Sequence, residues 1–185
     1  METKTVGKFK IEIEQDPDPL HPRKDWDNLG TMACFHRRYT LGDEGHGIKS
    51  EDYNGWDAMR AAIEKMDAAV ILPIYMLDHS GLTVATKPFH CPWDSGQIGF
   101  IYVTREKLRK EFSKKRVSKQ LIAKAAKQLE AEVEAYDQFL RGDVWVYAIK
   151  DEDEVIESCG GFFGIDECRK EAEAVAKRLA ETVTA

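Results

Sequence analysis

The sequence predicts an α+β fold, in a single domain where about four helices pack on an antiparallel sheet. Residues 69–103 hold three short runs rich in Val, Ile, Tyr and Phe, broken by Gly, Ser, Pro and Asp. Such runs are typical of an antiparallel meander. Residues 8–14 alternate strictly between charged and apolar side chains, as a half-exposed strand does. Hairpin-like pairs outnumber strand–helix–strand repeats, which favours α+β over a doubly wound fold.

The expected strands share β-branched and aromatic residues and are bounded by turn formers. They are residues 8–14, 31–36, 69–78, 82–86, 97–103, 144–149 and 155–159. Because proline cannot donate to a strand ladder, we expect a bulge or a sheet edge at Pro73. Residues 150–154 form the turn of the last hairpin, and the glycines of residues 160–164 indicate a loop after it.

Four helices are expected where apolar residues recur every three or four positions. Ser50 or Asp52 caps the first helix, Thr104 the second and Ser118 the third, and Gly142 ends the third. The helices are residues 50–67, 105–112, 118–140 and 165–182.

The length of 185 residues suits one core, burying about 70% of the surface of the unfolded chain. We expect the domain to span residues 1–185, with flexible ends at about 1–6 and 183–185. No apolar run approaches the ~20 residues of a membrane span, and no signal peptide is present, so we expect a cytoplasmic protein without a membrane partner. The scattered cysteines indicate free thiols. They are Cys34, Cys91, Cys159 and Cys168.

Charge is divided unevenly along the chain. Residues 1–104 carry 11 basic and 16 acidic side chains, residues 105–127 carry 10 and 2, and residues 128–185 carry 6 and 15. The net charges are therefore −5, +8 and −9. The total of −6 opposes non-specific adhesion to nucleic acid, but the partition predicts two surfaces of opposite sign.

The acidic surface is the tip of the last hairpin, where four carboxylates on a stiff support can imitate successive phosphates. The alternative is an ordinary polar turn. The candidate partner-binding residues are Asp151, Glu152, Asp153 and Glu154.

The basic surface, residues 105–127, could follow a phosphate backbone. The alternative is a solvated helical surface paired with acids elsewhere, and no aromatic residues for stacking are interleaved with these lysines. The candidate nucleic-acid contacts are Arg105, Lys114, Lys115, Arg116 and Lys119.

Cysteine and histidine residues offer two further chemistries. Four of them would make a tetrahedral zinc site if they met in space, although their spacing fits no usual zinc motif. These four are Cys34, His36, His90 and Cys91. A cysteine enzyme could be built on Cys91, His90 and Asp94, but Pro92 keeps the thiol away from a helix N-terminus that would lower its pKa. We therefore expect no metal, no cofactor and no catalytic residue.

Three segments together resemble a known family. They are residues 25–36 (DWDNLGTMACFH) with 39–43, residues 72–81 through 91–103 (containing WDSGQ), and residues 134–143. They are similar to small proteins carried by bacteriophages and mobile elements, most without an assigned function, some of which resemble anti-CRISPR proteins. The family ends in Ser-Cys-aromatic-Gly-Phe, whereas Gly160 replaces the aromatic residue here.

The resemblance implies a phage-encoded inhibitor of host CRISPR immunity, which binds the effector nuclease or its RNA-bound complex in the bacterial cytoplasm. It supplies no catalytic residues. Two alternatives stay open: a nucleic-acid-binding accessory protein using residues 105–127, and a Cys/His-dependent enzyme.

Overall fold

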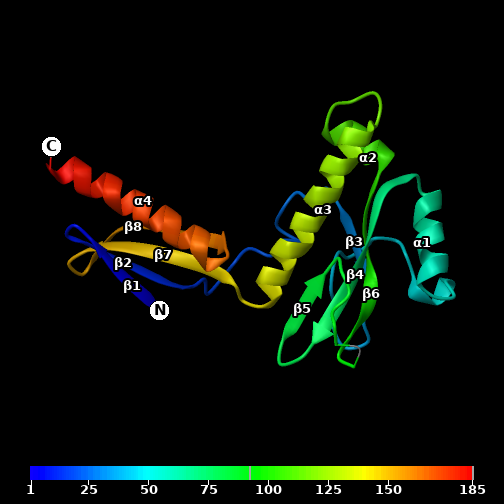
Figure 1. Cartoon of the computed structure of the whole chain (residues 1–185), viewed down its shortest axis with the longest axis horizontal. Helices are drawn as coiled ribbons and strands as arrows, with labels where there is room; N and C mark the ends of the chain where they lie inside the picture. Colours follow the sequence, from blue (N-terminus) through cyan, green and yellow to red (C-terminus); the bar gives the residue numbers. More distant parts are fainter. Residues whose placement is uncertain (92, 185) are drawn as a thin grey trace. The chain divides into compact units, whose positions relative to one another are not determined.

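The computed structural model describes residues 1–91 and 93–184, in which eight strands form two antiparallel sheets beside four α-helices (Figure 1). The predicted α+β class is confirmed. The chain divides into two compact units. Unit 1 contains Met1–Leu20 and Gln138–Ala185, and unit 2 contains His21–Asp137.

Unit 1 is a four-stranded antiparallel sheet with one helix on it. The strand order is β1 (Glu2–Val6), β2 (Phe9–Gln15), β7 (Val144–Asp151) and β8 (Glu154–Phe163). Helix α4 (Ile165–Thr184) lies along one face (Figure 1). The alternation of residues 8–14 explains this packing, because it directs one side of β2 into the core. The core comprises Phe9, Ile11, Ile13, Tyr147, Ile149, Cys168, Ala172, Val175 and Ala176.

Two expectations differ from the structure in unit 1. Residues 2–6, expected as a flexible end, are strand β1, because they pair with β2 from Glu2↔Ile13 to Val6↔Phe9. Residues 160–163, expected in a loop, continue β8. The predicted flexible end at residues 183–185 lies largely outside the described residues, because the side chains of Val183 and Thr184 and all of Ala185 are not described.

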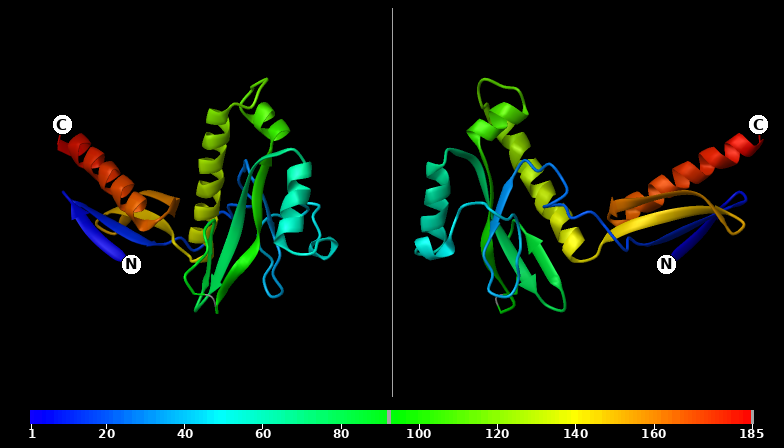
Figure 2. Two further views of the ribbon diagram at one scale, coloured as in Figure 1. Left: turned by 45° about the vertical axis from the view of Figure 1, so that its right-hand side comes forward. Right: turned by 180° about the vertical axis from the view of Figure 1, so that it is seen from behind.

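Unit 2 contains the predicted meander. Its sheet has the order β3 (Thr31–Cys34), β6 (Ser95–Thr104), β4 (Ala68–Asp78) and β5 (Leu82–Ala85). Figure 2 shows α1 (Trp56–Lys65) and α3 (Lys119–Leu140) on opposite sides of this sheet. Helix α2 (Arg105–Glu111) follows β6 directly. The core beside α1 comprises Ala33, Ile48, Met59, Ile63, Phe100 and Tyr102.

The helix caps of unit 2 were predicted correctly, apart from the first. Thr104 accepts a hydrogen bond from Lys107 N at 3.2 Å, and Ser118 accepts one from Leu121 N at 3.2 Å. The helix expected at residues 50–67 is instead a 3₁₀ turn, Ser50–Asp52, followed by α1. The interruption has a backbone cause, since Gly55 has a φ of 87°, which no α-helical residue adopts.

Pro73 lies in β4, which is a central strand and not an edge. Pro73 itself pairs in register with Phe100 of β6. The nearest irregularity follows at Ile74 and Tyr75, which pair with Gly99 and Gln97 and leave Ile98 of β6 as the extra residue. The expectation of a bulge or an edge at Pro73 was therefore wrong, since the bulge lies on the partner strand.

Candidate functional site

The acidic hairpin tip, residues 151–154, joins β7 to β8. Asp151 and Glu154 still pair as strand residues, so the turn itself is only Glu152 and Asp153. Glu152 has a φ of 54°, the left-handed conformation that tight two-residue hairpin turns require. The four carboxylates are thus held on a short, regular support.

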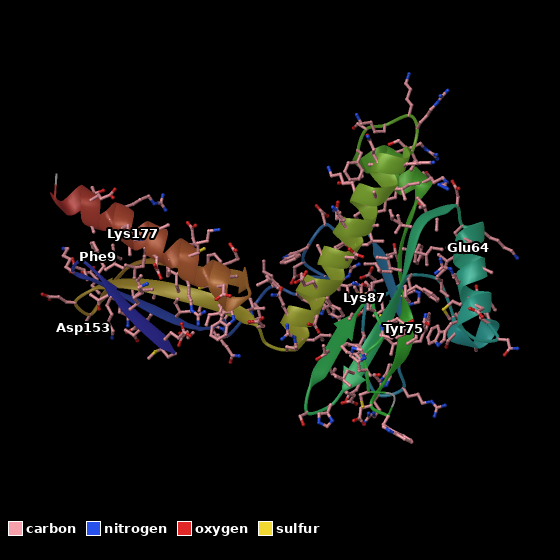
Figure 3. All side chains as sticks on the ribbon, in the orientation of Figure 1. Phe9, Glu64, Tyr75, Lys87, Asp153 and Lys177 are labelled. Atoms are coloured by element: carbon pink, nitrogen blue, oxygen red, sulfur yellow. The ribbon has the colours of Figure 1, made fainter. Side chains whose placement is uncertain are left out.

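Most of these carboxylates are available to a partner. Asp151 forms an ion pair with Lys8 of the same unit. Glu152, Asp153 and Glu154 are exposed and have no ion pair among the described residues, and Asp153 lies at the hairpin tip (Figure 3). Unit 1 as a whole carries nine basic and 16 acidic side chains, which is a net charge of −7. The predicted acidic surface is therefore the end of an acidic unit.

The basic segment, residues 105–127, comprises α2, a connector at residues 112–118 and the first turns of α3. Two of its cations are occupied: Arg105 pairs with Asp67 at 3.3 Å, and Lys107 donates to the carbonyl of Asn28 at 2.9 Å. Lys124 lies 4.7 Å from the ring centroid of Phe112.

The remaining cations of the basic segment are exposed and have no carboxylate partner among the described residues. They are Arg109, Lys110, Lys114, Lys115, Arg116, Lys119 and Lys127. The alternative explanation of the basic segment was that its cations pair with acids elsewhere in the chain. That explanation does not apply to these seven residues. Of the five predicted nucleic-acid contacts, only Arg105 is engaged by an acid.

A buried arginine holds α3, and with it the basic segment, in place. The side chain of Arg23 is only 1% exposed. Its guanidinium binds Asp43 in a bidentate pair at 2.8 and 2.7 Å, Glu132 of α3 at 2.9 Å, and the carbonyl of Gly30 at 2.8 Å. Burial alone would lower the pKa of Arg23, but the hydrogen bonds and charges of Asp43 and Glu132 outweigh burial and raise that pKa.

The two carboxylates are themselves fully used. Glu132 accepts hydrogen bonds from the backbone N–H groups of Leu29 and Gly30 at 2.7 and 3.0 Å. Asp43 accepts one from Met32 N at 2.8 Å. Sequence reasoning missed this network. The available signal was an acid, Glu132, one position from the buried Val133 on α3.

The cysteine and histidine candidates do not assemble into the sites considered. No group of three or more His, Cys, Asp or Glu residues within residues 1–91 and 93–184 is placed to hold a metal ion. The carboxylate of Asp94 lies between a thiol and an imidazole. It is 3.7 Å from Cys91 Sγ and 3.2 Å from His79 Nδ1. A thiol nucleophile requires the imidazole in contact with sulfur, with the carboxylate behind it. Here the carboxylate, and not the imidazole, is next to the sulfur, and the imidazole is that of His79 where His90 was expected.

An open hollow of about 580 Å³ beside residues 34–50 is lined by thiol, imidazole and carboxylate groups, but these are engaged or inert. Burial raises the pKa of Cys34 to about 12, and the charge of Asp43 adds to that increase. Asp43 is held by Arg23, and His36 stacks on Tyr39 with 5.1 Å between ring centroids. The hollow therefore offers no activated nucleophile.

Two large aromatic residues, Tyr136 and Trp93, differ in their burial. Tyr136 is 2% exposed and its hydroxyl accepts a hydrogen bond from Gly42 N at 3.3 Å, so it belongs to the core. Trp93 is 91% exposed.

No protein-family model matches this chain, and no curated protein or solved structure matches it either. The resemblance of residues 25–43, 72–103 and 134–143 to phage proteins stays a prediction. Among the described residues, no helix combines the length and the apolar character needed to cross a bilayer.

Replacing Arg23 by alanine should lower the free energy of unfolding of unit 2 by about 3–5 kcal/mol, because Asp43 and Glu132 would lose their buried counter-ion. Urea denaturation measures the change. Arg37→Ala, at an exposed arginine that has no ion pair within residues 1–91 and 93–184, is the matched control and should cost at most about 0.5 kcal/mol. Equal effects of the two variants would contradict the role given to Arg23.

Timed alkylation near pH 8, followed by mass spectrometry, should modify exposed Cys159 first. Burial raises the pKa of Cys34 to about 12 and that of Cys168 to about 11, so at most about 0.1% of either thiol is ionised there. In urea all four cysteines should react at similar rates. Modification of native Cys34 as fast as Cys159 would show an activated thiol and revive the enzyme hypothesis.

Proposed function

We propose that this chain is a phage-encoded inhibitor of host CRISPR immunity, which binds the effector nuclease or its guide complex in the bacterial cytoplasm. It acts by contact and performs no chemistry. The family resemblance supplies the biological setting. The observation that carries the mechanism is the row of carboxylates at the acidic hairpin tip, of which Glu152, Asp153 and Glu154 have no ion pair in the described part of the chain.

The physical argument rests on the surface that such nucleases present. An effector holds its guide–target duplex in a positively charged channel, through contacts to the phosphate backbone. Carboxylates on a strand-borne hairpin offer the same sign of charge on a stiff support. A unit with a net charge of −7 is also steered towards a basic channel over longer distances, which raises the association rate.

Reversing the hairpin charges tests this mechanism. The triple variant Glu152→Lys, Asp153→Lys, Glu154→Lys should lose at least about 100-fold in affinity for the effector, because like charges juxtaposed at an interface cost several kcal/mol. In cells it should permit plasmid interference that the unaltered chain blocks. Pull-down with effector and guide RNA measures the complex.

The control for this experiment makes a charge change of the same size in another part of the chain. Glu51→Lys, Asp52→Lys, Asp57→Lys alters three exposed acids of unit 2 and should leave inhibition intact. Inhibition by the hairpin triple variant would remove the hairpin from the mechanism. Failure of the unaltered chain to bind any effector, or to block interference by several CRISPR types, would remove the function.

A second candidate is a nucleic-acid-binding accessory protein that uses the basic segment. The specific observation in its favour is the set of seven exposed cations that have no carboxylate partner in the part of the chain that the structure describes. Unlike the first candidate, it predicts binding to nucleic acid alone, without an effector protein.

Filter binding of single-stranded RNA over a salt series tests the second candidate. Lys114→Ala, Lys115→Ala, Arg116→Ala should weaken binding and reduce the slope of log K against log salt by about 2, since each phosphate contact contributes roughly 0.7. Lys49→Ala, Lys65→Ala, Lys87→Ala removes three exposed lysines elsewhere and should change neither quantity. Binding that is absent or insensitive to salt would dispose of this candidate.

A further inference from the structure

The two sheets have four edge strands, and at each edge of unit 2 a central residue is hydrogen-bonded by the chain itself. On β5, the N–H of Val84 donates to the Asp137 carboxylate of α3 at 2.8 Å. On β3, Met32 N donates to the Asp43 carboxylate and Met32 O accepts from Asp43 N, both at 2.8 Å. Backbone groups that could pair with another chain are therefore occupied there.

The two edges of unit 1 differ from each other. Strand β1 carries Glu2 and Lys4, which are tied to Arg169 and Glu173 of α4 by ion pairs. Charged side chains of this kind are a common protection of an edge. Among the described residues, β8 has no such ion pairs with α4. Among the described residues, its backbone up to Gly160 bonds only with β7 and within β8, and Asp16 reaches Gly161 at 2.9 Å.

The exposure of β8 is unusual for a sheet strand. Every residue from Glu154 to Gly161 is exposed. Val155 and Ile156 are 52% and 44% exposed, respectively. The pairing of β7 with β8 has a register irregularity at this point, where Lys150 pairs with Val155 and Ile149 with Glu157, leaving Ile156 as the extra residue. Such a bulge re-aims a side chain. An open edge thus carries two adjacent apolar side chains.

We propose that β8 accepts an extended, basic segment of a partner protein as a fifth strand of the unit 1 sheet. Main-chain hydrogen bonds would supply affinity, and contacts to alternate side chains would supply selectivity. The inference rests on the proposed function only for the existence of a protein partner. It adds the mode of contact, which is strand addition, and the chemistry of the segment bound.

Charge selects this occupant over a second copy of the chain. Beside the acidic hairpin tip, β8 also carries Glu157. Pairing two copies of β8 antiparallel about Glu157 would place the two Glu157 carboxylates opposite each other, and like charges across a strand pair are destabilising. In any register, both paired strands would be acidic. A segment in which Lys or Arg alternates with β-branched residues would instead meet each carboxylate with a cation and place apolar side chains near Val155 and Ile156.

The test uses a synthetic peptide of about ten residues in which Lys and Val alternate, measured by fluorescence anisotropy. Two N-methylated versions carry the methyl groups on either the odd or the even residues. In an antiparallel pair, alternate residues direct their N–H groups to the neighbouring strand. We therefore expect one N-methylated peptide to lose at least about tenfold in affinity and the other to bind like the parent. Equal binding by both would overturn strand addition in favour of attraction by charge alone.

Variants of the protein locate the site. Glu157→Lys and Val155→Lys should each weaken peptide binding several-fold, whereas Glu167→Lys, which makes the same charge change as the former on α4, should not. Far-ultraviolet circular dichroism verifies that each variant is folded. A Glu/Val peptide should not bind. A stable dimer of the unaltered chain in sedimentation, formed through β8, would overturn the proposal by making a second copy the occupant.

The two proposals can fail separately. If the chain blocks interference and binds an effector, but the Lys/Val peptide does not bind, strand addition is wrong and the inhibitor function stands. If the peptide binds with the alternating N-methyl pattern and no effector is bound, β8 is an edge for basic strands and the CRISPR assignment is wrong.

Discussion

Unit 2 depends on one buried charge. Arg23 has its guanidinium enclosed by Asp43, Glu132 and the carbonyl of Gly30. Removing these ions from water is costly, and the cost is offset only because donors and acceptors match in number and direction. The same contacts join the loop at residues 21–30, the edge of β3 and helix α3. The basic segment is therefore carried on a helix whose position is fixed by an ionic network as well as by apolar packing.

Unit 1 uses a different principle. Its core is apolar, from the inward side of β2 and β7 to the small residues of α4, and its charges lie outside that core. On the opposite face of the sheet, Glu12 pairs with Lys10 at 2.6 Å and Lys150 at 2.7 Å, so part of the acidic excess is neutralised locally. At the hairpin tip, Asp151 is the only carboxylate with an ion pair among the described residues. The tip therefore keeps more of its negative charge than this face of the sheet does.

The features predicted from sequence are those decided by neighbours in the chain. Alternation in residues 8–14, the caps Thr104 and Ser118, and the hairpin turn each depend on a few consecutive residues, and all are present. The break before α1 was not predicted, because the apolar residues of 50–67 recur with helical spacing and Gly55 alone interrupts the helix. The Arg23 network was out of reach, since Glu132 is 109 positions away and only the folded chain brings the two together. The positions of the acidic tip and basic segment were predictable. Which of their charges find an ion-pair partner among the described residues, as Asp151 and Arg105 do, was not.

The acids along β8 act in two ways at once. An open edge with exposed Val155 and Ile156 would ordinarily invite self-pairing and aggregation, and charge is one device by which proteins suppress it. Placing only one sign of charge there suppresses pairing with an identical strand while leaving a strand of opposite sign attractive. An edge with charges of both signs, or with none, would discriminate less between an identical strand and a strand of opposite charge. The carboxylates proposed to meet a basic partner therefore also explain how the outer edge of so exposed a strand avoids pairing with a second copy of itself.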